Sequence, residues 1–140
     1  MAFAAIVDAS AMVALFGKDQ ADNARYSQLF AQAAHEQWSL TSTWPCVTEA
    51  SHLLGLPQRF AFLRWVAADA ISIFPFDQDT LEGMAELMRR YTESPRTEMD
   101  LADASLVFLA SDTGVTRIMT RDVRDFSRYR LADGRAFEIL

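Results

Sequence analysis

The sequence contains a single cysteine and lacks any long apolar run free of charge. One cysteine, Cys46, cannot form a disulfide within the chain, and it excludes a zinc site built from paired thiolates. No uncharged apolar run reaches the ~20 residues that a helix needs to cross a bilayer. The apolar N-terminal segment also lacks the basic leader of a secretory signal, and Asp8 interrupts it. These absences predict a soluble protein of the cytoplasm.

Basic residues are in the minority, with 13 Lys and Arg against 19 Asp and Glu, so the formal net charge is −6. This balance argues against a protein that coats nucleic acid by bulk attraction. It does not exclude an enzyme that acts on nucleic acid, because a cluster of cation-binding carboxylates would itself make the sequence acidic. The charge alone therefore leaves the partner open.

The chain has no internal repeat and no linker-like stretch, and its 140 residues suffice for one domain, 1–140, with a hydrophobic core. Short apolar segments alternate with longer segments that carry apolar residues at helical spacing. The expected strands are 3–7, 38–43, 70–74, 116–120 and 136–140. The expected helices are 10–16, 22–34, 45–54, 58–68, 77–91 and 101–110, with a polar loop at 93–98. This alternation predicts an α/β fold with a mostly parallel sheet.

Acidic residues stand where such a sheet forms its sites, beyond the carboxyl ends of the strands. Asp8 follows the first expected strand and Asp122 follows a late one. Glu49 lies in the first turns of the helix after the second strand. Asp100 and Asp103 open the most apolar helix, three residues apart and so on one face. We expect these carboxylates to converge at one edge of the sheet.

Carboxylates that converge repel one another and raise each other's pKa values unless a cation neutralises them. A hard divalent cation such as Mg²⁺ or Mn²⁺ prefers oxygen ligands and resolves the conflict. A cation held in this way lowers the pKa of bound water and stabilises charge on a phosphoryl oxygen. The pattern therefore favours hydrolysis of a phosphodiester.

Each acid also has a structural explanation. Asp100 suits a helix N-cap, and Asp103 in the first helical turn favours the helix dipole. Asp122 is typical of a turn after a strand, and Glu49 of a solvated helix face. Asp8 is harder to explain in this way, because apolar residues flank it on both sides. The combination, more than any single residue, indicates a site.

The pattern resembles that of PIN-domain proteins, among them the VapC-type toxins, over essentially the whole chain. The matching segments are Ile-Val-Asp-Ala-Ser at 6–10, Val-Thr-Glu-Ala at 47–50, Leu-Ala-Asp-Ala-Ser-Leu at 101–106 and Met-Thr-Arg-Asp-Val-Arg-Asp-Phe at 119–126. Each segment is weak alone, and their order and spacing make the joint match specific.

The resemblance implies a three-layer α/β/α sandwich and a metal-dependent endoribonuclease that is the toxin of a toxin–antitoxin pair. It assigns the catalytic and metal-binding acids to Asp8, Glu49, Asp103 and Asp122, with Mg²⁺ or Mn²⁺ as the cofactor. Ser10 and Thr120 stand beside these acids and are expected to orient ligands or water. Asp100 is an additional acid, expected near the metal ligands or at the substrate.

The resemblance further implies an RNA substrate, a cognate antitoxin protein and a homodimer. Segments 22–34 and 58–68 offer apolar residues for such contacts, although their Trp, Phe and Leu side chains are more simply explained as core. We interpret Asp125 and Phe126 as turn and packing residues. Five arginines form a candidate phosphate-binding rim or solvated helix faces: Arg59, Arg64, Arg89, Arg90 and Arg96. His35 and His52 have no partner motif, and Cys46 is expected to be buried.

Three alternatives stay open. An Asp after the first strand also suits a phosphatase with Asp8 as covalent nucleophile, although Ser10 stands where dehalogenase-like enzymes have a second acid. A receiver domain is disfavoured, because Lys18 is the only lysine and stands early in the chain. The second alternative is a catalytically vestigial binding module, and the third is cleavage of DNA in place of RNA.

Overall fold

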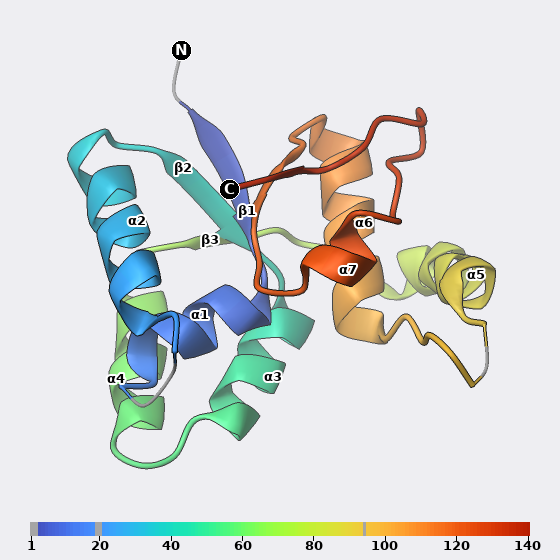
Figure 1. Cartoon of the computed structure of the whole chain (residues 1–140). Helices are drawn as coiled ribbons and strands as arrows, with labels where there is room; N and C mark the ends of the chain where they lie inside the picture. Colours follow the sequence, from blue (N-terminus) through green and yellow to red (C-terminus); the bar gives the residue numbers. More distant parts are fainter. Residues whose placement is uncertain (1–2, 19–20, 94) are drawn as a thin grey trace.

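The computed structural model describes residues 3–18, 21–93 and 95–140. Residues 1 and 2 of the apolar N-terminal segment and residue 94 of the expected polar loop lie outside this range. Within the described ranges, no helix combines the length and the apolar character needed to cross a membrane. Figure 1 shows a central sheet flanked by helices on both sides, α2 and α4 on one side and α5 and α6 on the other.

The described residues form one five-stranded sheet in the order β3-β2-β1-β4-β5. The strands are β1 (Ala4–Val7), β2 (Ser39–Ser42), β3 (Ser72–Ile73), β4 (Arg117–Met119) and β5 (Glu138–Ile139). All four pairings are parallel. The predicted α/β/α sandwich is confirmed, with a sheet that is parallel throughout. The central strand β1 is buried between β2 and β4, as expected for a short apolar run.

The helices follow the predicted positions closely. They are α1 (Ala9–Phe16), α2 (Asn23–His35), α3 (Trp44–Leu53), α4 (Gln58–Ala67), α5 (Leu81–Tyr91), α6 (Leu101–Thr113) and α7 (Val123–Phe126), with the 3-10 turn η1 (Gln78–Thr80) before α5. Two differences concern short elements. The expected helix 77–91 begins as η1, where the Asp77 side chain accepts from the Asp79 N–H. Helix α7 was not predicted, because four residues are too few to show helical periodicity.

Local signals explain how α6 is placed. Its N-cap is Asp100, whose side chain accepts a hydrogen bond from the Asp103 N–H at 2.8 Å. Gly114 ends the helix with a φ of 77°, a left-handed conformation that glycine adopts without strain. Between these ends most side chains are buried, so α6 is held on several sides. The first turn of α6, which carries Asp103, is therefore fixed in position.

Aromatic rings fill the space between α1, α2 and α4. The rings of Phe16, Phe30, Phe62 and Trp65 contact one another, with edge-on centroid distances of 5.4 to 5.7 Å in three of the pairs. This confirms that much of segments 22–34 and 58–68 serves the core. The interpretation as core is wrong for Phe60 and Leu63, which are 57% and 39% exposed. Their positions on α4 turn away from the ring cluster, and periodicity alone does not show which residues at the edge of an apolar stripe stay uncovered.

Candidate active site

Acidic side chains gather at the carboxyl edge of the sheet in a hollow of about 180 Å³, termed here the acidic pocket. Asp8 comes directly after β1, Glu49 from α3, Asp103 from α6 and Asp122 from the end of the β4–α7 connection. Among the described residues, the acids that line it are Asp8, Glu49, Glu98, Asp100, Asp103, Asp122 and Asp125, together with Ala9, Ser10 and Leu53. The four predicted acids thus come together, with Asp100 and Ser10 beside them.

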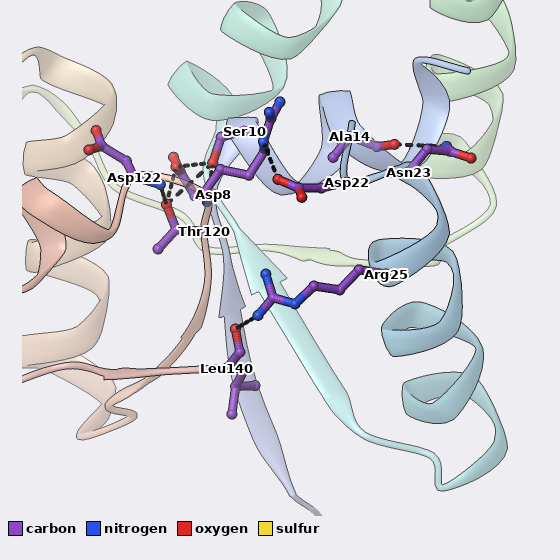
Figure 2. A network of polar contacts seen from close by, with 10 residues as sticks. Asp8, Ser10, Ala14, Asp22, Asn23, Arg25, Thr120, Asp122 and Leu140 are labelled. Carbon is purple, nitrogen blue, oxygen red and sulfur yellow. Dashed lines mark hydrogen bonds and ion pairs between the residues drawn. The ribbon is translucent and has the colours of Figure 1, made fainter. Parts of the chain in front are cut away.

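Asp8 is held in one orientation by three hydrogen bonds, and Figure 2 shows the two that come from Ser10 and Thr120. The Ala9 N–H donates to Oδ1 at 2.8 Å, which makes Asp8 the N-cap of α1. The hydroxyls of Ser10 and Thr120 donate to Oδ2 at 2.7 and 2.8 Å. The side chain is only 4% exposed. Burial and these donors leave the Asp8 carboxylate little freedom to rotate.

The same two hydroxyls also hold the chain that follows β4. The Arg121 N–H donates to Ser10 Oγ and the Asp122 N–H donates to Thr120 Oγ1, both at 2.9 Å. Each hydroxyl therefore donates to Asp8 and accepts from the backbone beside Asp122 (Figure 2). The predicted neighbours Ser10 and Thr120 thus contact an acid directly, and they tie β1 to the connection that carries Asp122.

Tyr129 is a site residue that the sequence analysis missed. Its hydroxyl donates to Asp103 Oδ2 at 2.8 Å across a separation of 26 residues. The ring is fully buried and contacts those of Tyr91 and Phe126 edge-on, each at a centroid distance of 5.0 Å. No motif in the sequence marks this tyrosine, because its partner is defined only by tertiary packing. The contact leaves Asp103 Oδ1 free of Tyr129.

The interpretation of Asp125 as a turn residue is incomplete. Asp103, Asp122 and Asp125 each offer a carboxylate oxygen, and these atoms lie within 4.8 Å of one another. The Asp125 N–H also donates to Asp122 Oδ1 at 3.4 Å, and Arg128 forms an ion pair with Asp125 at 3.1 Å. Asp125 therefore has both a turn contact and a place in the acidic pocket. The packing role of Phe126, which is fully buried, is confirmed.

Burial and mutual repulsion raise the pKa values of these acids. Burial, followed by the charges of Asp100, Asp8 and Asp122, raises the pKa of Glu49 to about 7. Burial is also the largest cause for Asp103, whose pKa rises to about 8 although the Tyr129 hydroxyl lowers it. For Asp122, burial and then Asp125 raise the pKa to about 6. Without a cation, the acidic pocket therefore disfavours the charged forms of these acids.

The donor set fits a hard divalent cation. The polar groups that converge are carboxylate oxygens, which are the ligands that Mg²⁺ and Mn²⁺ prefer. A bound cation would also relieve the repulsion that the raised pKa values express. The close group of Asp103, Asp122 and Asp125 supplies three oxygens, and Asp8 and Glu49 line the same pocket.

The other candidate residues take different places. Within the described part of the chain, none of the five arginines of the candidate rim lines the acidic pocket. Arg59 donates to the carbonyls of Ser51 and Leu54, and so has a structural contact. Cys46 is fully buried, which confirms the prediction, and burial raises the pKa of its thiol. His52 lines a separate hollow beside the acidic pocket.

The protein is thus an α/β protein with a parallel sheet and a group of carboxylates gathered beyond the ends of its strands. The PIN domain family matches residues 5–131, and the chain belongs to that family.

Comparison with solved structures gives the same fold. The structure of VapC20 from Mycobacterium tuberculosis, described as a toxin that cleaves the sarcin–ricin loop, superposes with a TM-score of 0.74. The match covers 86% of this chain and 92% of that one, at 17% sequence identity. No curated protein matches the sequence significantly.

Proposed function

We propose that this protein is a metal-dependent endoribonuclease, and that it is the toxin of a toxin–antitoxin pair acting in the cytoplasm. The observation that carries the proposal is the convergence of Asp8, Glu49, Asp103 and Asp122 in one pocket. These acids come from four separate segments of the chain. A purely structural role for each, as a cap or a solvated side chain, gives no reason for them to meet.

In this proposal Asp8, Glu49, Asp103 and Asp122 hold Mg²⁺ or Mn²⁺, and Asp125 adds a fifth carboxylate. When bound, the cation lowers the pKa of water and stabilises charge on the phosphoryl oxygen. The hydrogen bonds from Ser10 and Thr120 hold the Asp8 carboxylate in one orientation. Tyr129 does the same for Asp103. The acids then need little reorganisation to receive the cation, which favours catalysis by a preorganised site.

The contacts of Ser10 disfavour the phosphatase alternative. Dehalogenase-like phosphatases, which use such an aspartate as covalent nucleophile, have a second acid where Ser10 stands, and here the Ser10 hydroxyl donates to Asp8 Oδ2. The vestigial alternative is disfavoured by the presence of all four acids, since a binding module would have no need to keep them together.

RNA as the substrate, and a toxin's role, are supported by the family and by the structural likeness to a toxin that cleaves RNA. A partner is supported by exposed apolar side chains. Leu53, Leu56 and Phe60 are each more than half exposed, and Leu53 also lines the acidic pocket. An antitoxin segment with apolar side chains would cover these exposed residues, and a basic residue in the same segment would pair with the carboxylates of the acidic pocket. We also propose that the protein forms a homodimer, as similar toxins do. Analytical sedimentation measures this oligomeric state directly.

The test is cleavage of total RNA by the purified protein with Mg²⁺, with Mn²⁺ and with a chelator. Asp103→Asn is the inactivating variant. Asp112→Asn is its matched control, because Asp112 lies on the same helix, is exposed and does not line the pocket. We expect metal-dependent cleavage by the wild-type protein and the control, and none by Asp103→Asn. Intact RNA throughout, from a folded protein that binds Mn²⁺, would contradict the nuclease unless its substrate is absent from the preparation.

Calorimetric titration tests the ligands separately from activity. We expect Mn²⁺ affinity to fall at least tenfold in Asp8→Asn and in Asp103→Asn, because each removes a carboxylate ligand from the pocket. Unchanged affinity in both variants would show that the cation binds elsewhere. Expression without a partner should arrest growth of the host, and Asp103→Asn should abolish the arrest.

A further inference from the structure

A second hollow adjoins the acidic pocket and differs from it in chemistry. It has a volume of about 860 Å³ and lies between α3, the segment that follows β3 and the first turn of α6. Glu49 and Asp100 line both hollows. The two hollows therefore share a wall, and a ligand held by the carboxylates lies beside the second hollow.

Aromatic side chains dominate this second hollow, termed here the aromatic pocket. Phe74 and Phe76 follow β3, and both rings contact Phe108 of α6 edge-on, with centroid distances of 6.1 and 6.5 Å. These contacts fix that wall to the fold. Trp44 at the start of α3 is different, because it is 60% exposed. Together with Phe74 and Phe76 it gives the hollow a largely apolar lining, which is typical of a ligand site.

Polar groups in the aromatic pocket are few and suitably placed. Thr48 and His52 follow Trp44 at intervals of four residues, so the three side chains lie along one face of α3. A hydroxyl and an imidazole each donate or accept hydrogen bonds at the edge of a ligand. Flat apolar walls with a few such groups match a nucleobase, which stacks through its faces and is recognised through its edges.

The surrounding charge selects a base over a phosphate for this pocket. Glu49 and Asp100 in the shared wall repel an anion, so a phosphate is favoured only where a cation binds. A nucleobase carries no charge and avoids this repulsion. An RNA strand can therefore place a phosphate in the acidic pocket and the neighbouring base in the aromatic pocket.

The geometry points to a nucleobase subsite, in which Trp44, Phe76 and His52 receive the unpaired base of a nucleotide that flanks the scissile phosphate. This assignment rests on the proposed ribonuclease function and specifies which part of the substrate binds beside the cut. Stacking on Trp44 supplies affinity, and Thr48 and His52 read the edge of the base.

The test measures binding of a short labelled single-stranded RNA of randomised sequence, and of the same RNA made without bases, by fluorescence anisotropy. Ca²⁺ replaces Mg²⁺, and gel analysis afterwards verifies that the RNA is intact. Trp44→Ala should weaken binding of the intact RNA about tenfold and leave binding of the base-free RNA unchanged. Trp44→Phe keeps a ring and should weaken binding less than Trp44→Ala does. Leu81→Ala, which removes an exposed apolar side chain outside the aromatic pocket, should change neither.

Each other outcome overturns the subsite in a recognisable way. If Trp44→Ala binds the intact RNA as the wild-type protein does, while metal-dependent cleavage persists, the nuclease stands and the subsite is wrong. If the wild-type protein neither binds nor cleaves RNA, both proposals fail. If Trp44→Ala converts a dimer to a monomer in sedimentation, a second copy of the chain covers the pocket. Because Trp44 is largely exposed, circular dichroism should show that its variants fold normally.

Discussion

Asp103→Asn should make the metal-free protein more stable, although it removes a proposed metal ligand. In the folded protein the pKa of Asp103 lies at about 8, against 3.8 for the unperturbed side chain. Between about pH 4 and pH 8 the folded state therefore binds a proton that the unfolded state has released. The free energy of unfolding falls as the pH rises from about 4 to about 8, because the unfolded state binds fewer protons. A neutral amide of the same shape avoids this loss.

The magnitude follows from the pKa difference. A tenfold change in proton affinity corresponds to about 1.4 kcal/mol, so the perturbation of Asp103 is worth at most roughly 4 kcal/mol at pH 7. Neighbouring acids regain charge when Asp103 is replaced, which offsets part of the gain. We therefore expect Asp103→Asn to stabilise the metal-free protein by about 1 to 3 kcal/mol, or roughly 3 to 10 °C in Tm. Tyr129 can still donate to the amide oxygen.

Thermal unfolding in chelator, followed by circular dichroism at several pH values, measures both the gain and its pH dependence. The wild-type Tm should fall between pH 6 and pH 8, and the slope should be smaller in Asp103→Asn. Excess Mn²⁺ should reverse the order of stability, since a cation that binds only the folded state stabilises it. The control Asp112→Asn should lie within about 0.5 kcal/mol of wild type. A metal-free Asp103→Asn protein less stable than wild type would refute the reasoning.

Three further predictions concern single contacts. Tyr129→Phe removes the donor to Asp103 Oδ2 and should weaken Mn²⁺ binding several-fold by calorimetry, with a stability loss of only about 1 kcal/mol. Asp100→Asn keeps the N-cap and should lower the pKa of Glu49 in an NMR carboxyl titration, because Asp100 is the strongest of the charges that raise this pKa. Asp100→Ala also removes the N-cap and should in addition cost about 1 kcal/mol in denaturant unfolding. Phe62→Ala empties the centre of the ring cluster and should cost about 3 to 5 kcal/mol in denaturant unfolding, and a loss below 1 kcal/mol would contradict the packing described.

The order of the strands and of the longer helices could be predicted because each of these elements carries its own local signal. Apolar runs mark β1 and β4, and apolar residues at helical spacing mark α2 and α5. Five acids could be placed together because they stand at strand ends or in the first turns of helices, which a parallel sheet brings to one edge: Asp8, Glu49, Asp100, Asp103 and Asp122. The resemblance to the family then selected Asp8, Glu49, Asp103 and Asp122 as the catalytic acids.

Contacts that depend on how distant segments pack were beyond the sequence. Tyr129 reaches Asp103 only after α7 has turned the chain back toward α6, and nothing in the residues around Tyr129 signals this. Asp125 was assigned to a turn because its turn contact is local, while its approach to Asp103 is not. Glu98 lies in the segment before α6, which lacks the periodicity that would have oriented it.

The hydrogen bonds of Asp8 have a practical consequence for any mutational study of this protein. Asp8 caps α1 and, through Ser10 and Thr120, joins two neighbouring strands of the sheet. A substitution at Asp8 therefore removes a folding contact together with a proposed ligand, and a loss of activity there has two explanations. The Asp103 side chain has fewer contacts with the fold. After Asp103→Asn, the Tyr129 hydroxyl can still donate to the amide oxygen. An inactive protein intended to trap its RNA or its protein partner is better made at Asp103.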